Sequence, residues 1–124
     1  MPIATSARPA SAPPQSAVID GIFRALSDPT RRDVVERLSH KPASVSELAA
    51  SYKMAMPSLL EHLKILEGSG LVRSEKKGRV RTYELAAERL KVAEDWLGHQ
   101  RKLWQRRLDQ HDAYLLQLKK EGLK

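Results

Sequence analysis

The chain has 124 residues, a net charge of +7 and no cysteine, and each of these properties narrows the possible functions. The length suits one small domain with a single core and argues against a two-domain enzyme. The excess positive charge must lie on the surface, where it favours a polyanionic partner such as nucleic acid or an acidic membrane. The lack of cysteine excludes disulfides, thiolate metal sites and cysteine nucleophiles.

The N-terminal region carries no sign of a targeting signal or of folded structure. No stretch approaches the roughly 18 apolar residues of a membrane span, and no basic and then apolar secretion pattern occurs, so we expect a cytoplasmic protein without a membrane partner. Residues 1–16 hold four of the seven prolines, one cation and no acid. Because they bury too little apolar area to offset chain entropy, we expect a disordered tail.

Two short helices are predicted after this tail. Apolar residues recur at helical spacing from Val18 and give a first helix that ends near Ser27. Asp28 is a preferred N-cap residue and Pro29 suits the first helical position, where its missing N–H is not needed. A second helix therefore runs from Pro29 to about Ser39.

Two further helices follow, each with its own start signal. The segment from Ser44 to Glu47 has the S-x-x-E form of a capping box and opens a short third helix. A fourth helix begins at Pro57 and ends near Gly68 and Gly70. One side of it is apolar and carries Leu59, Leu63 and Leu66.

A β-hairpin and a long helix complete the chain. Residues 71–75 and 80–85 are β-prone and are joined by residues 76–79, in which Gly78 can adopt a positive φ. A helix of about 30 residues begins near Ala87. Its apolar side carries Leu90, Trp96, Leu97, Leu103, Trp104, Leu108, Leu115 and Leu118.

This order of elements predicts a winged helix-turn-helix, a mainly α fold with a small β-hairpin (α-α-α-α-β-β-α). A helix fits the major groove of duplex DNA, where each base pair shows a distinct pattern of donors and acceptors. A hairpin with cations at its tip can reach phosphates or the minor groove. Double-stranded DNA is therefore the expected partner.

Four segments together carry a resemblance to a known family: ALSDPTRRDVVERL (25–38), VSELA, HLKILEGSGLV (62–72) and GRVRTYEL. Over roughly residues 18–110 the chain resembles the arsenic-repressor, or ArsR-like, family. The resemblance implies a winged-helix transcriptional repressor that dimerises through its first and last helices. In many members a bound metal ion releases the DNA. The expected organisation is a tail (1–16), a DNA-binding domain (17–86) and a dimerisation helix (87–121).

The resemblance places the recognition helix and its approach at residues 55–64 and the wing at residues 76–81. Where the family often has small polar residues and an Arg, this chain has Met56, Pro57, Leu60 and Glu61. Base reading is therefore expected to depend on thymine methyl groups and on a Glu that accepts from cytosine N4. The candidate DNA-contacting residues are Arg31, Arg32, Lys53, Met56, Ser58, Leu60, Glu61, His62, Lys64, Lys76, Lys77, Arg79 and Arg81.

Several of these residues have a structural alternative. Ser58 is either an N-cap, because Glu61 lies three residues later, or a phosphate donor. Arg31 is either a phosphate contact or an ordinary surface arginine, and Pro57 is read as a helix-start residue. A charge run in a turn is usually only solvated, but the position of these cations behind a recognition helix favours DNA contact.

No metal site and no cofactor are predicted. Thiolate sensors of the family carry Cys-x-Cys in the third helix, where this chain has Ser44 and Ser46. A second family site uses Asp and His of the last helix, but the partners expected after His111 fall beyond the helix end. His62 is read as a packed or phosphate-contacting side chain rather than a ligand. The candidates read as solvated helix residues are Asp95, His99, Asp109, His111 and Asp112.

The last helix favours a homodimer. Its apolar side spans about 20 residues, or some 30 Å, which is more than the four short helices can cover as an intramolecular core. A two-fold dimer would place two recognition helices about 34 Å apart and predicts an inverted-repeat operator. The candidate interface residues are Ile19, Ile22, Phe23, Trp96, Leu97, Leu103, Trp104, Leu108 and Leu115.

The sequence therefore predicts a homodimeric, sequence-specific DNA-binding repressor whose inducing ligand is unknown. The alternative is a protein-interaction module that keeps the winged-helix shape and binds a partner through its last helix. An enzyme is not expected, because the chain has no Gly-rich phosphate loop, no carboxylate pair framed by apolar residues and no Ser/His/Asp set at recognisable spacing.

Overall fold

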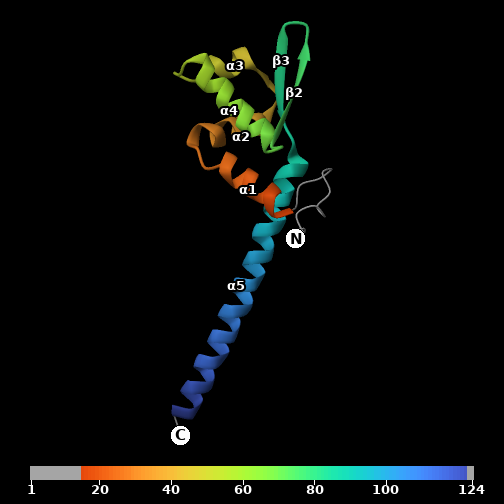
Figure 1. Ribbon diagram of the computed structural model, residues 1–124. Coiled ribbons are helices and arrows are strands. Elements are labelled where there is room, and N and C mark those ends of the chain that lie inside the picture. Colours follow the sequence, from red (N-terminus) through yellow and green to blue (C-terminus); the bar gives the residue numbers. More distant parts are fainter. Residues whose placement is uncertain (1–14, 123–124) are drawn as a thin grey trace, which may run out of the picture. The chain divides into compact units, whose positions relative to one another are not determined.

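The computed structural model describes residues 15–122 and confirms the predicted fold class (Figure 1). The chain divides into two compact units, Met1–Leu90 and Lys91–Lys124. The elements in chain order are α1 (Gln15–Ala25), α2 (Pro29–His40), β1 (Ala43–Ser44), α3 (Val45–Ala49), α4 (Met56–Gly68), β2 (Val72–Lys77), β3 (Val80–Leu85) and α5 (Ala87–Gly122).

The first helix differs from its expected limits at both ends. Most of the expected tail lies outside the described residues, but Gln15 and Ser16 belong to α1 rather than to a tail. The helix ends at Ala25, two residues before the expected Ser27. Beyond Ala25 the chain makes a turn, in which the Ser27 side chain donates to the carbonyl oxygen of Arg24 at 2.6 Å.

The next two helices begin as their capping residues predict. The Asp28 carboxylate accepts a hydrogen bond from the backbone N–H of Arg31 at 3.0 Å, and Pro29 is the first residue of α2. In α3 both bonds of the capping box are present: Glu47 N–H donates to Ser44 Oγ at 3.1 Å, and Ser44 N–H donates to Glu47 Oε1 at 2.9 Å.

The core lies where α4 packs against α1, α2 and β2. The three leucines predicted on one side of α4 are at most 1% exposed, so this helix is held by its apolar side. Burial of each such side chain stabilises the fold by roughly 1.5–3 kcal/mol. The largest fully buried side chains of the core are those of Ile22, Val34, Leu48, Leu59, Leu63, Leu66 and Leu71.

The sheet has three antiparallel strands in the order β1-β3-β2, one more than the sequence predicts. Strand β1 has only two residues, and Ala43 pairs with Tyr83. The hairpin loop is also shorter than expected, because β2 continues through Lys77, which pairs with Val80. Gly78 has φ +64 in this loop, as predicted for a tight hairpin turn.

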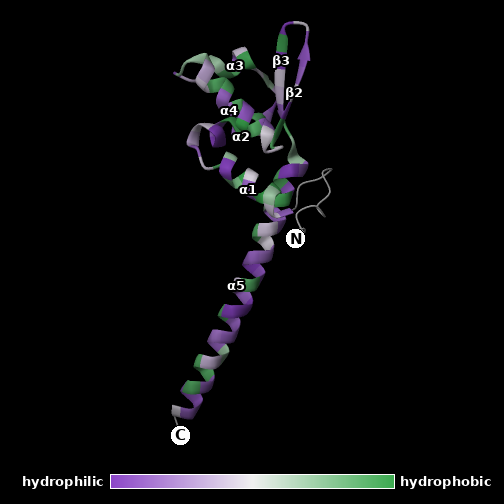
Figure 2. Cartoon of the chain, in the orientation of Figure 1, coloured by the Kyte–Doolittle hydropathy of each residue, from purple (hydrophilic) through white to green (hydrophobic). Residues whose placement is uncertain are grey.

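The second unit consists of the greater part of α5. The whole helix has 36 residues, about one-fifth longer than expected. From Arg101 to Gly122 every residue is exposed within the chain, and apolar turns alternate with polar turns along it (Figure 2). No helix among residues 15–122 combines the length and apolar character that crossing a bilayer requires.

Candidate nucleic-acid interface

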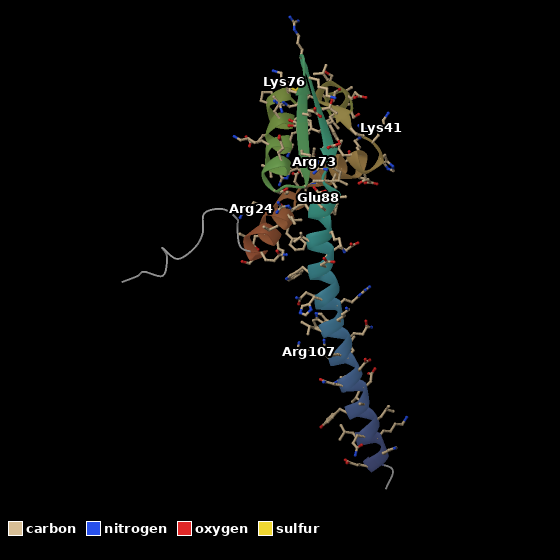
Figure 3. The ribbon with its side chains drawn as sticks, turned by 90° about the vertical axis from the view of Figure 1, so that its right-hand side faces the viewer. Arg24, Lys41, Arg73, Lys76, Glu88 and Arg107 are labelled. Atoms are coloured by element: carbon tan, nitrogen blue, oxygen red, sulfur yellow. The ribbon has the colours of Figure 1, made fainter. Side chains whose placement is uncertain are left out.

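The wing presents its cations at the tip of the β2–β3 hairpin. Lys76, Lys77 and Arg79 are exposed, and Figure 3 shows Lys76 toward the far end of the hairpin. Lys76 and Arg79 make no ion pair with any residue that the structure describes, and Lys77 Nζ is 4.0 Å from Glu75 Oε1. The tip therefore carries positive charge that internal contacts compensate only in part.

At the base of the same hairpin the charge is neutralised. Arg73 Nε is 3.0 Å from Glu84 Oε1, and its Nη1 is 2.6 Å from Glu88 Oε2. Figure 3 shows Arg73 and Glu88 side by side there. Hydrogen bonds to Glu84 and then Glu88 raise the pKa of Arg73 above its ordinary value. The hairpin thus carries cations at its tip that are little compensated and, at its base, a cation that is fully paired with carboxylates.

Arg81 lies between these two regions and is held by the sheet. Its Nη1 donates to Ser74 Oγ at 2.8 Å, and this hydroxyl donates to Glu67 Oε2 at 2.8 Å. The chain of hydrogen bonds joins the wing to the C-terminal turn of α4. Of the predicted wing contacts, Arg81 is therefore the one with an internal structural role.

The N-terminus of α4 tests one of the two interpretations of Ser58, that as an N-cap. The N-cap residue is Ala55, the helix begins at Met56, and Pro57 lies in its first turn as expected for a helix-start residue. Ser58 is inside the helix, so its interpretation as an N-cap is wrong and the phosphate-donor interpretation remains.

The outward side of α4 carries most of the remaining candidates. Met56 and Leu60 are each 44% exposed, and Glu61 and Lys64 are exposed beside them. Lys53, in the connection that leads into α4, is exposed as well. These side chains share the solvent-facing surface of α4 and its approach.

Arg31 is used inside the fold. Its Nε donates to the carbonyl oxygen of Ala25 at 2.7 Å and its Nη2 to that of Arg24 at 3.2 Å. Its Nη1 is 3.2 Å from Nδ1 of His62, which lies 3.8 Å from the Asp28 carboxylate. Arg31 therefore satisfies carbonyl groups at the end of α1 and contacts α4. Neither the surface-arginine interpretation nor the phosphate interpretation includes this role.

The side chains of Arg32 and Tyr52 also form hydrogen bonds within the fold. Arg32 Nη1 donates to the carbonyl oxygen of Leu26 at 2.7 Å, although its side chain remains exposed. Tyr52 donates to Asp33 at 2.5 Å, and the Arg37 guanidinium lies 5.5 Å from the ring centre. Burial and the bond to Asp33 raise the pKa of Tyr52. The connection before α4 is thereby fixed to α2.

The dimer-interface candidates separate into two groups. Ile19 and Ile22 are buried within the single chain, so they belong to the core and are not available to a second chain. Phe23 is partly exposed, at 37%. The α5 candidates are all exposed within the chain: Trp96, Leu97, Leu103, Trp104, Leu108 and Leu115.

Metal ligands do not converge in the described part of the chain. Among residues 15–122 no three His, Asp or Glu side chains are arranged to hold a metal ion. Asp95, one of the candidate ligands of the last helix, forms a 3.2 Å ion pair with Lys91. His62, which lies outside the last helix, faces Arg31 and Asp28 at the start of α2.

The geometry defines a class of protein: a winged helix-turn-helix with a packed α4, an exposed α4 face and a basic wing tip. Comparisons with known proteins agree with this class. The helix-turn-helix domain family matches residues 26–75. A solved ArsR family transcriptional regulator, RHA00566, is 49% identical, with a TM-score of 0.70 over 73% of this chain and 93% of that one. The chain belongs to the ArsR family of transcriptional regulators.

Two regulators of Mycobacterium tuberculosis show how far the similarity extends. The HTH-type transcriptional regulator Rv2034 is 42% identical over 66 residues, which are 53% of this chain and 62% of the relative. The repressor SmtB of strain H37Rv is 35% identical over 82 residues, 64% of this chain and 61% of the relative. The chain thus spans somewhat less than two thirds of the length of these relatives.

Proposed function

We propose that the chain is a sequence-specific DNA-binding repressor that acts as a homodimer on an inverted-repeat operator in the cytoplasm. The observation that carries the proposal is the wing: its tip cations Lys76 and Arg79 make no ion pair with a described residue. Cations that are not paired with a carboxylate can neutralise phosphates, and the adjacent α4 has an exposed side that can contact bases.

Internal hydrogen bonds support a smaller set of DNA contacts than the sequence suggests. Arg31 and Arg81 are better assigned to bonds within the fold. The proposed phosphate contacts are Lys53, Ser58, Lys64 and the three cations of the wing tip. The proposed base contacts face outward on α4 and are Met56, Leu60 and Glu61.

The proposed dimer rests on α5 and on family membership. Trp104 is 61% exposed and Leu108 54%, and both lie within the helical segment that belongs to the second unit. Large apolar side chains on one helix in this number are typical of an interface. Repression is supported by similarity to repressors such as the transcriptional repressor SdpR of Bacillus subtilis, which is 28% identical over 79 residues.

Selection of bound duplexes from random DNA by the full chain tests the proposal. We expect enrichment of one inverted repeat whose half-sites are about one helical turn apart. Binding to that repeat should weaken steeply as salt rises, because phosphate neutralisation by the protein depends on the release of counterions. Recovery of no enriched duplex would reject DNA binding and favour the protein-interaction module.

A further inference from the structure

The exposed side of α4 differs from what an electrostatic DNA contact would need. Met56 and Leu60 are each 44% exposed, so the solvent-facing surface of α4 beside the buried leucines is partly apolar. Two acids of α4, Glu61 and Glu67, outnumber its one cation, Lys64, and give a formal charge of −1 with histidine neutral. The helix itself therefore contributes little attraction to phosphates, which the wing tip must supply.

The side chains of α4 also lack the guanidinium and amide groups that form two hydrogen bonds to one purine base. Its sequence, MPSLLEHLKILEG, contains no Arg, Asn or Gln, and Lys64 is its one residue of a type that bonds bidentately to guanine. The guanidinium that faces α4, that of Arg31, already donates to two carbonyl groups of α1. Around Leu60 the solvent-facing surface of α4 therefore offers aliphatic carbon beside the Glu61 carboxylate, the Lys64 ammonium group and the Ser58 hydroxyl.

We propose that α4 reads the operator through thymine methyl groups, with Leu60 as the residue that contacts them and Met56 beside it. The C5 methyl group of thymine is the apolar feature of the major groove, and an aliphatic side chain removes it from water. The Glu61 carboxylate, next to Leu60, can only accept hydrogen bonds, so the base group that suits it is an amine donor such as cytosine N4. This inference rests on the proposed DNA binding and specifies the base chemistry of the operator.

The test replaces single thymines by deoxyuridine, which lacks only the methyl group, in a duplex selected by the full chain. We expect one or two positions at which the replacement weakens binding about fourfold per methyl group. Leu60→Ala should bind the thymine and deoxyuridine duplexes equally well. Leu116→Ala, a change at an exposed leucine of α5, should keep the fourfold preference.

The outcomes separate two kinds of failure. If no duplex is enriched, the DNA-binding proposal itself is wrong. If a duplex is enriched but no deoxyuridine replacement changes the affinity, thymine reading by Leu60 is wrong and DNA binding stands. The same conclusion follows if a replacement lowers the affinity of Leu60→Ala as much as that of the unchanged chain. The duplex selection uses the unchanged chain, so it tests DNA binding even if the Leu60→Ala variant folds poorly.

A second variant tests the carboxylate beside Leu60. In Glu61→Gln the amide both donates and accepts, a pattern that matches adenine N6 and N7. We expect the base preferred at one position to change to adenine while the thymine preference assigned to Leu60 persists. An unchanged base preference at every position would remove Glu61 from the reading surface.

Discussion

Asp28 shows how one side chain serves local structure and tertiary contact together. Its carboxylate accepts from the backbone N–H of Arg31 at 3.0 Å and lies 3.8 Å from Nδ1 of His62 on α4. The hydrogen bond from Arg31 is the largest cause that lowers the pKa of Asp28, and the nearby charges of His62 and Arg31 add to it against an opposing effect of burial. The ionised carboxylate is therefore the form that the folded state prefers.

Replacing Asp28 by Ala should lower the free energy of unfolding by about 1 kcal/mol at pH 7, because the first turn of α2 loses its cap. Urea denaturation at fixed protein concentration measures this difference. The folded pKa lies below the unfolded value of about 3.9, so the charge contributes stability above that pH. This contribution is lost as the pH falls through the folded pKa.

Asp28→Asn is the matched control, since an amide oxygen can still cap the helix but carries no charge. It should be less stable than the unchanged chain at pH 7, with a difference that shrinks as the pH falls below about 4. A difference that stays constant between about pH 7 and about pH 3 would mean that the charge of Asp28 adds nothing to the fold.

At the scale of elements, the wing contains two kinds of cation. Those at its tip are exposed, whereas Arg73 and Arg81 are bonded to other side chains of the fold. Replacing Lys76, Lys77 and Arg79 together by Ala should weaken binding to all sequences, because phosphate contacts carry no base information. The slope of log affinity against log salt should also become less steep, by about 0.9 for each phosphate that the variant no longer neutralises. Fluorescence titration of the selected duplex at several salt concentrations measures both quantities.

Arg73→Ala is the control for this experiment, because it removes a cation from the same hairpin that is already paired with Glu84 and Glu88. Its salt slope should match that of the unchanged chain. An unaltered slope in the triple variant, or an equal loss in Arg73→Ala, would show that position in the hairpin does not decide which cations contact DNA.

Sequence patterns predicted the elements better than they predicted the roles of individual cations. The caps of α2 and α3 follow from local residue types, because Asp28 and Ser44 bond within their own first turns. Strand β1 escaped prediction, since two residues give no alternation and its partner β3 is distant in the sequence. The role of Arg31 likewise depends on carbonyl groups of another helix.

At the scale of the whole molecule, several exposed apolar residues of α5 are spaced by seven residues. Trp104 lies seven residues after Leu97 and Leu118 fourteen residues after Trp104, with His111 at the position between, and Leu108 and Leu115 are also seven apart. A seven-residue apolar repeat keeps one seam of a helix directed at a partner helix. This pattern agrees with a second copy of α5 as the partner.

Trp104→Glu should therefore dissociate the proposed dimer, because it would replace an apolar side chain of each copy by a charge in the seam between the two helices. Sedimentation velocity should show a species of 14.0 kDa in place of one with about twice that mass. Leu116→Glu is the control, since Leu116 is exposed but lies outside the repeat, and it should leave the dimer intact. A dimer that persists in Trp104→Glu would place the interface elsewhere.

The same pair of variants links dimerisation to operator binding. If the two wings contact the two half-sites of one inverted repeat, Trp104→Glu should bind an isolated half-site as well as the unchanged chain does. It should bind the full repeat far more weakly, because the second half-site no longer gains from the high effective concentration within a dimer. Equal loss on both duplexes would instead indicate damage to the fold, which thermal unfolding of the variant would reveal.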